Sequence, residues 1–247
     1  MKKVSIIIPC HNDGQYLPEA LACAFAQTWE NKEIIIIDDG SADEATLKLL
    51  DDLRQDSRVT VLRHEQAKGP SAARNTAIRA GKGEYIMPLD ADDKIEPDYI
   101  AKAAAVLDSR PEVGAVYAHG DYFGEVTGPM KLKDYNLRDM LVDNVVFVSA
   151  LIRRSAFEQA GLYDEAFRTG LEDYDGFLGL LEHGWEIVQL PETLFYCRVK
   201  PVSRTTKMVD DTEKYRATYQ MLYDKHKQLY LDNLDLVFPA LKEAFVA

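Results

Sequence analysis

The chain has 247 residues, of which 47% are hydrophobic, and a formal net charge of −12 at pH 7. That length suits one large α/β domain or two small ones, and the apolar residues suffice for a real core. The negative charge argues against nucleic acid as the main partner, because a phosphate backbone requires a basic face. The three scattered cysteines show no zinc-ligand spacing; they argue against a disulfide framework and fit a reducing cytoplasm.

Strands and helices are predicted to alternate along the first 93 residues. Continuous apolar runs over residues 4–8, 33–38, 59–62 and 84–89 are typical of strands buried on both faces of a parallel sheet. Apolar residues at helical spacing over 16–27, a capping box at 41–44 and a helix that ends before Gly81 place helices between these strands. The pattern predicts a Rossmann-like, mostly parallel central sheet flanked by helices.

After residue 93 the predicted elements no longer alternate regularly between strand and helix. We expect a helix opened by Pro97 that ends near residue 109, a strand over 113–123, a polar loop over 124–134 and a strand over 145–152. A helix is predicted to begin at 170–173, followed by short strands over 186–190 and 193–199. From residue 211 onward, Tyr and Leu residues at helical spacing predict a C-terminal helical tail.

Polar residues follow the carboxyl ends of three predicted strands, at 9–12, 38–39 and 90–93. Ligands of such sheets bind beyond these strand ends, so the three segments should gather at one edge. A buried strand that ends in three acids requires a positive charge nearby. Asp90 and Asp92, one residue apart, offer the oxygen ligands that suit Mg²⁺ or Mn²⁺ shared with a diphosphate. The pattern alone is weak, since Asp173 and Asp175 repeat it elsewhere in the chain.

Taken together, these segments resemble the inverting glycosyltransferases of family 2, which have the GT-A fold. The matching stretches occur in the family's order: VSIIIPCHN from residue 4, EIIIIDDGS from 33, GPSAARN from 69, MPLDADD from 87 and LED from 171. The glycine-rich phosphate-binding motifs are absent, so a metal and basic side chains would have to hold the phosphates. The resemblance implies a GT-A domain over 1–210, with a nucleotide-binding half (1–93) and an acceptor-binding half (94–210), and a helical extension over 211–247.

The resemblance also implies a role for individual residues. Asp39 is expected to hydrogen-bond the nucleobase, and Asp92 is expected to bind the metal. Asp173 is expected to be the catalytic base that takes the proton of the acceptor hydroxyl. Glu172 is expected to orient the acceptor or support its loop. The other positions assigned to nucleotide-sugar binding are Pro9, His11, Asn12, Lys68, Arg74, Asp90 and Ala91.

One departure from the family pattern concerns the end of the last strand. Family members often carry a His in a Tyr-Arg-x-His-x-x-Ser pattern, and this chain has Lys200 at the corresponding place. A protonated lysine cannot ligate a metal, but it can pair with a diphosphate as a point charge. We therefore predict a phosphate contact for Lys200 and no third protein ligand to the metal. Arg204 and Lys207 lie in the same stretch, which is expected to close over the donor.

The predicted activity is transfer, with inversion, of a hexosyl or N-acetylhexosaminyl group from a UDP-sugar, with Mn²⁺ or Mg²⁺ as cofactor. The expected acceptor is a saccharide or lipid-linked saccharide in polysaccharide or glycolipid synthesis, selected by residues 120–145 and the tail. The expected location is the cytoplasm, including the inner face of the membrane; peripheral membrane association and a homodimer stay open. Three alternatives also stay open: a sugar-phosphate nucleotidyltransferase, a non-catalytic nucleotide-sugar-binding domain, and a phospho-acceptor signalling domain.

Overall fold

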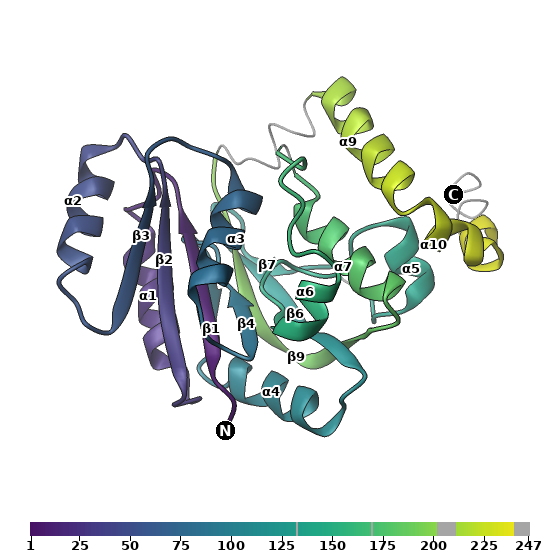
Figure 1. Ribbon diagram of the computed structural model, residues 1–247, viewed down its shortest axis with the longest axis horizontal. Coiled ribbons are helices and arrows are strands. Elements are labelled where there is room, and N and C mark those ends of the chain that lie inside the picture. The colour runs from purple at the N-terminus through teal and green to yellow at the C-terminus, as the bar shows by residue number, and fades with distance from the viewer. Residues whose placement is uncertain (132, 169, 202–210, 240–247) are drawn as a thin grey trace.

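The computed structural model describes residues 1–131, 133–168, 170–201 and 211–239. Within them, nine strands form one sheet in the order β3-β2-β1-β4-β8-β6-β9-β5, with β7 paired to β6 (Figure 1). The strands are β1 (Val4–Cys10), β2 (Lys32–Asp39), β3 (Val59–His64), β4 (Tyr85–Pro88), β5 (Lys94–Ile95), β6 (Val113–Gly124), β7 (Gly128–Pro129), β8 (Leu151–Arg153) and β9 (Glu186–Val199). The helices are α1 (Leu17–Ala26), α2 (Glu44–Leu53), α3 (Pro70–Ala80), α4 (Tyr99–Ser109), α5 (Leu137–Val142), α6 (Arg154–Gln159), α7 (Glu172–Glu182), α9 (Thr212–Lys225) and α10 (Lys227–Asp232).

The central sheet flanked by helices confirms the predicted fold class, although the sheet as a whole is mixed. Strands β3, β2, β1 and β4 are all parallel, as the strand–helix alternation predicts. Beyond β4, strand β8 runs antiparallel to both β4 and β6, and β5 runs antiparallel to β9. Only the pair of β6 and β9 is parallel in this half of the described sheet. The run of adjacent parallel strands therefore ends at β4, where the regular strand–helix alternation of the sequence also ends.

The predicted strand over 145–152 was largely wrong. Only its end pairs with the sheet, as β8, while Val146 and Ala150 are buried without belonging to a strand. The hydroxyl of Tyr99 donates a hydrogen bond to the carbonyl of Ser149 at 2.7 Å, which satisfies one backbone group of this segment. The apolar run thus indicated burial correctly, because a short apolar run alone does not distinguish a strand from another buried segment.

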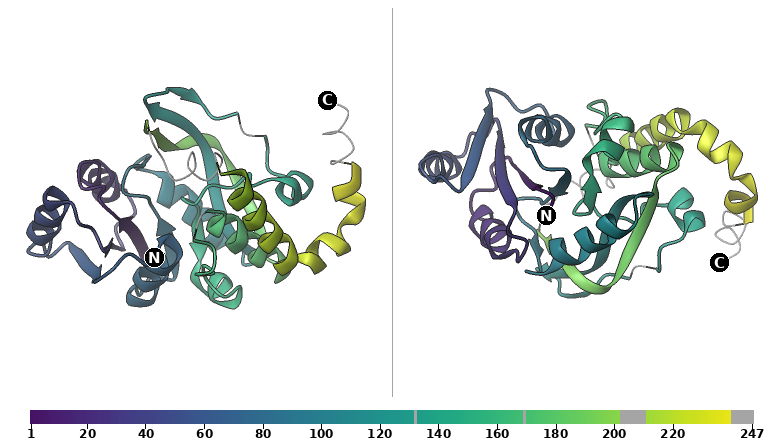
Figure 2. Two further views of the ribbon diagram at one scale, coloured as in Figure 1. Left: turned by 90° about the horizontal axis from the view of Figure 1, so that it is seen from above. Right: turned by 60° about the horizontal axis from the view of Figure 1, so that its bottom comes forward.

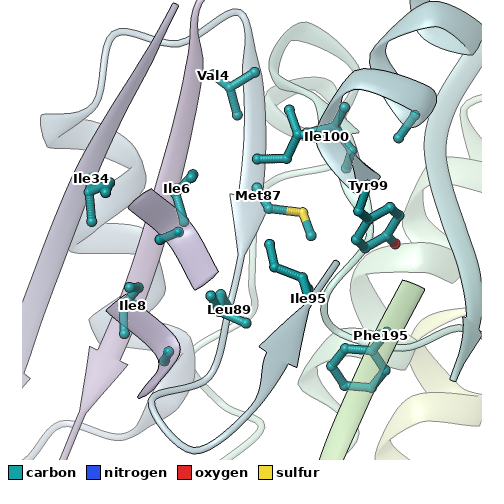
Figure 3. Packing of buried hydrophobic residues seen from close by; sticks show 14 of the residues in the cluster. Val4, Ile6, Ile8, Ile34, Met87, Leu89, Ile95, Tyr99, Ile100 and Phe195 are labelled. Carbon is teal, nitrogen blue, oxygen red and sulfur yellow. The ribbon is translucent and has the colours of Figure 1, made fainter. Parts of the chain in front are cut away.

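Side chains of the parallel strands divide between two cores, one on each face of the sheet. Val4, Ile6 and Ile8 point to the face covered by α1 and α4, together with Met87, Leu89, Ile95, Tyr99, Ile100 and Phe195 (Figure 3). Ile7, between them, points to the opposite face, which α3, α6 and α7 cover. This is the alternation that a strand imposes on successive side chains. Burial on both faces explains why these strands are continuously apolar.

Helices α9 and α10 lie against the half of the molecule that contains α5, α6 and α7, at the opposite end from β3 and α2 (Figures 1 and 2). Leu222 and Tyr230 of these helices are buried in the core beside α7. Asp175 of α7 is buried and accepts hydrogen bonds from Nζ of Lys225 and Nε2 of His226, both at 2.9 Å. Hydrogen bonds to a buried carboxylate and apolar contacts therefore attach the C-terminal helices to α7. None of the helices in the described ranges combines the length and apolarity needed to cross a bilayer.

We predict that Asp175→Ala lowers the free energy of unfolding by about 3 kcal/mol, because Nε2 of the buried His226 and Nζ of Lys225 lose this carboxylate. Urea denaturation followed by circular dichroism measures this change. Asp224→Ala is the matched control on the exposed side of α9, where Asp224 bonds only to Gln220 among the described residues. The control is expected to change stability by less than about 0.5 kcal/mol. Equal effects of the two substitutions would show that Asp175 does not anchor the tail.

Candidate donor-binding and catalytic site

The carboxyl ends of β1, β2 and β4 meet at one edge of the sheet, as predicted. The parallel register sets Cys10 of β1 beside Asp38 of β2, and Ile7 beside Pro88 of β4. The loops that leave these strands carry the acids and the polar turn identified in the sequence. These loops contact one another directly, through the side chains described below.

Asp39 at the end of β2 holds the loop that follows β3. Its Oδ1 accepts hydrogen bonds from Nδ1 of His64 at 2.7 Å and from the backbone N–H of Lys68 at 2.9 Å. Its Oδ2 accepts one from the backbone N–H of Gly69 at 2.8 Å. A carboxylate has about four acceptor positions, so these three bonds leave one on Oδ2. Gly69 has a φ of 95°, a conformation that favours glycine at this approach to the carboxylate.

The turn after β1 lies against Asp39 and the start of α2. Nδ1 of His11 donates to the backbone carbonyl of Asp39 at 2.7 Å, and the ring itself is exposed. Oδ1 of Asn12 accepts from the backbone N–H groups of Ala42 and Asp43 at 2.8 and 2.9 Å. Pro9 is half-buried at the end of the strand. His11 therefore lies beside Asp39, as the sequence analysis expects, while Asn12 joins the turn after β1 to the segment that leads into α2.

Arg74 of α3 bridges two segments that are far apart in the sequence. Its guanidinium donates to Oδ1 of Asp90 at 2.6 Å and to Oε1 of Glu172 at 2.8 Å. The side chains of Arg74 and Glu172 are each only 2% exposed. Burial opposes the charged form of Arg74, but the carboxylates of Asp90 and Glu172 keep its pKa well above the usual value. A contact of Arg74 with base or phosphate stays a prediction. The contacts that the structure describes join α7 to the loop after β4, residues 89–93, which is called the acid loop below.

Asp92 is paired with Lys200. The Lys200 Nζ lies 2.6 Å from Oδ2 of Asp92 and 3.1 Å from Oδ1 of Asp13, which belongs to the turn after β1. The Lys200 ammonium therefore links the acid loop to the turn that borders the predicted base pocket. Its phosphate contact stays a prediction, whereas Arg204 and Lys207 lie outside the described residues.

The backbone next to Lys200 is fastened to the same acid loop. The N–H of Arg198 donates to Oδ1 of Asp93, and Nε of Arg198 donates to the carbonyl of Asp92, both at 2.9 Å. Burial, followed by the charges of Asp92 and Asp90, raises the pKa of Asp93 well above its usual value. Burial and the charge of Asp90 also raise the pKa of Asp92, although Lys200 opposes this shift. The loop is therefore a place where an added cation is electrostatically favoured.

Helix α7 presents Glu172 and Asp173 in its first turn. The preceding residue, Leu171, has a φ of 65°, so the chain turns sharply into the helix. Glu172 points into the protein toward Arg74, whereas Asp173 is only partly buried and its Oδ1 accepts the N–H of Tyr174 at 2.8 Å. Asp175, in the same Asp-X-Asp pattern, faces the C-terminal helices instead. The first turn of α7 thus carries both a candidate base and a structural acid.

Two predicted donor-binding residues bring no side chain to the site in the contacts described for this chain. Ala91 is buried in the core on the α1 side of the sheet. Lys68 donates its backbone N–H to Asp39, and its side chain is exposed. Their predicted contacts with the donor stay predictions.

The residues at Asp92 fit a divalent metal. A carboxylate oxygen is the ligand that Mg²⁺ and Mn²⁺ prefer, and Lys200 shows that a cation is already held against it. Among the described residues, no group of three His, Cys, Asp or Glu side chains could hold a metal between them. Asp92 would therefore supply one ligand, and the diphosphate and water would complete the coordination, as is common for Mg²⁺.

Three residues of this site had no role in the sequence analysis: Asp13, His64 and Arg198. His64 ends β3 at the same edge, so the strand-end argument applied to Asp39 could have identified it. Arg198 precedes Lys200 in the pattern already quoted for the last strand. Asp13 gave no such signal, because an acid in a polar turn is ordinarily solvated.

Comparison with known proteins identifies the family. The glycosyl transferase family 2 model matches residues 5–161. An uncharacterized glycosyltransferase of Haemophilus influenzae is 29% identical over 223 residues, which cover 87% of this chain and 74% of the relative. The succinoglycan biosynthesis protein ExoU of Rhizobium meliloti is 31% identical over 243 residues, covering 89% of this chain and 69% of ExoU.

Solved structures agree on the fold. Residues 1–349 of S. aureus TarS, in complex with UDP, match with a TM-score of 0.66 at 21% identity, over 81% of this chain and 61% of that one. The mannosyltransferase PcManGT from Pyrobaculum calidifontis, in complex with GDP-Man and Mn²⁺, matches with a TM-score of 0.67 at 19% identity, over 100% of this chain and 76% of that one. The family match decides against the nucleotidyltransferase and signalling alternatives. The chain belongs to glycosyl transferase family 2 and is a glycosyltransferase with the GT-A fold.

Proposed function

We propose that this glycosyltransferase moves a sugar from a UDP-sugar to a hydroxyl acceptor with inversion, in a single displacement. The observation that carries the proposal is the Arg74 bridge. It joins Asp90, in the loop expected to hold the donor, to Glu172, whose neighbour Asp173 is the candidate base. A buried guanidinium held by two carboxylates fixes these two parts of the site relative to each other, and catalysis by displacement depends on such fixed positions.

The nucleobase is proposed to bind between His11 and Asp39. The remaining acceptor position on Oδ2 of Asp39 suits an imide N–H, which uracil has. The TarS structures with UDP and with UDP-GlcNAc support a uridine donor, while PcManGT with GDP-Man shows that another base is found among proteins of this fold. The diphosphate would then extend toward Asp90 and Asp92 at the same edge.

In the proposed reaction the acceptor oxygen bonds to the anomeric carbon while the bond from that carbon to the diphosphate oxygen breaks. The bonding electrons leave with the diphosphate, and the carboxylate of Asp173 takes the proton of the acceptor hydroxyl. No covalent intermediate is needed, so one base suffices. Mn²⁺ or Mg²⁺ bound at Asp92 would neutralise charge on the departing diphosphate. Lys200 is proposed to contact the same phosphates.

We propose a saccharide or a lipid-linked saccharide as acceptor, in polysaccharide or glycolipid synthesis. The similarity to ExoU, named as a succinoglycan biosynthesis protein, supports a polysaccharide product. We propose that the reaction takes place in the cytoplasm, and at the inner face of the membrane if the acceptor is lipid-linked.

Incubation of the protein with a panel of UDP-sugars and GDP-Man, with saccharide acceptors and Mn²⁺, tests the proposal. We expect release of UDP from one UDP-sugar only when an acceptor is present, and NMR of the product should show an inverted anomeric configuration. A product with retained configuration would contradict the single displacement. Failure to consume any nucleotide-sugar would favour a non-catalytic binding domain.

A further inference from the structure

The ammonium group of Lys200 occupies the place beside Asp92 where a metal would be expected. It lies 2.6 Å from Oδ2 of Asp92 and 3.1 Å from Oδ1 of Asp13, so it is shared by two carboxylates. The side chains of Lys200 and Asp92 are each 18% exposed, which limits the screening of this pair by water. The contact is therefore a partly buried ion pair rather than an exposed one.

The position of Lys200 is set by its neighbours as well as by charge. Two residues earlier, Arg198 is bound through its backbone to Asp93 and through its side chain to the carbonyl of Asp92. The Lys200 Nζ also lies 5.2 Å from the centre of the Tyr16 ring, within the range of a cation–π contact. The end of β9 is thus hydrogen-bonded to the acid loop, and these bonds position the Lys200 ammonium beside Asp92.

A divalent ion bound to Asp92 would lie within a few ångströms of this ammonium. Two cations at such a distance repel each other, and the repulsion is considerable where water is partly excluded. Because Oδ2 of Asp92 is already engaged, a metal must displace the ammonium or bind against its charge. An incoming diphosphate changes this balance, because its negative oxygens can accept both cations.

We propose that Lys200 competes with the divalent metal for Asp92 in the donor-free protein and moves to the diphosphate when nucleotide and metal bind together. This inference rests on the proposed function for the identity of the diphosphate ligand. Metal alone then binds weakly, nucleotide alone retains a cationic partner, and each strengthens the binding of the other by the same factor. The lysine makes metal loading depend on the donor.

The test compares the wild-type protein with Lys200→Met and Lys200→Gln, the second of which keeps a polar group that can bond to Asp92. Isothermal titration measures the binding of Mn²⁺ alone and of UDP without metal. The matched control is Lys94→Met, which removes the same charge from the same edge, where Lys94 pairs with Glu19 instead. Circular dichroism establishes that each variant is folded.

We expect both Lys200 variants to bind Mn²⁺ alone at least about tenfold more tightly than the wild type, because an adjacent positive charge has been removed. The same variants are expected to bind UDP without metal about tenfold more weakly, because a charged hydrogen bond to the phosphates is lost. Lys94→Met should match the wild type in both titrations. Opposite changes for the two ligands are the signature of a shared cation.

Equal Mn²⁺ affinity in the wild type and both Lys200 variants would overturn the inference, as would equal gains in Lys94→Met and the Lys200 variants. If UDP still binds in that case, the proposed function stands without the competition. If no variant binds UDP but Mn²⁺ binds more tightly to both Lys200 variants alone, the competition stands and the proposed donor fails.

Discussion

The Asp173→Asn variant is expected to lose about 100- to 10,000-fold in kcat, the contribution typical of a general base. Asparagine has nearly the same size and can keep the polar contacts of the first turn of α7, but it cannot take the proton of the acceptor hydroxyl. UDP affinity is expected to stay within about twofold, because Asp173 has no part in proposed donor binding. Initial rates of UDP release, combined with UDP titration, measure both quantities.

The competing explanation of Asp173 is that an acid in the first turn of a helix merely complements the helix dipole. That role is worth about 0.3–1 kcal/mol of stability and would not affect turnover. Asp139→Asn is the matched control, since Asp139 occupies the first turn of α5 and accepts a hydrogen bond from Asn136. A small loss of stability in both variants, with kcat unchanged in Asp173→Asn, would refute the assignment of the catalytic base.

Replacing Arg74 with methionine is expected to lower the free energy of unfolding by about 3–5 kcal/mol. The substitution removes the guanidinium that lies between the buried Glu172 and the half-buried Asp90, and the loss of an opposite charge at a buried site is costly. The double variant Arg74→Met, Glu172→Gln removes the most buried of these charges and should recover part of the loss. Urea denaturation monitored by fluorescence measures the free energy of unfolding of the wild type, of Arg74→Met and of the double variant.

Arg79→Met, on the same helix, controls for the loss of an arginine from α3. The Arg79 side chain is 62% exposed and pairs with Glu165 at 3.8 Å, so its removal should cost less than about 0.5 kcal/mol. Similar losses for Arg74→Met and Arg79→Met would mean that the bridge contributes little. No recovery in the double variant would point to lost packing of the Arg74 side chain rather than to unpaired charge.

The parallel half of the fold was predictable because local pattern and global position agree there. The runs ending at Ile8, Ile37 and Leu89 are apolar on both faces, as central strands of a parallel sheet are, and the helices predicted between them support that assignment. The acids after these runs could be assigned to one edge without knowledge of the structure, since parallel strands end together. Family resemblance added the separate roles of Asp39, Asp92 and Asp173.

The ion pairs were not predictable, because they join residues that only the tertiary fold brings together. Nothing in the sequence around Arg74 shows that its guanidinium is buried between residues 90 and 172. Asp173 and Asp175 also look alike in the sequence, yet Asp173 is only partly buried while Asp175 is buried against the C-terminal helices. The sharing of Lys200 between Asp92 and Asp13 likewise depends on the path of β9 past the acid loop.

Titration of UDP with and without Mn²⁺, on the wild type and on Asp92→Ala, tests the central claim most directly. The wild type should bind UDP, and Mn²⁺ should strengthen that binding at least about fivefold, the lower end of typical coupling between two ligands. In Asp92→Ala the strengthening by Mn²⁺ should disappear. Absence of UDP binding in the wild type under both conditions, or equal strengthening by Mn²⁺ in Asp92→Ala, would contradict a metal-assisted donor site at Asp92.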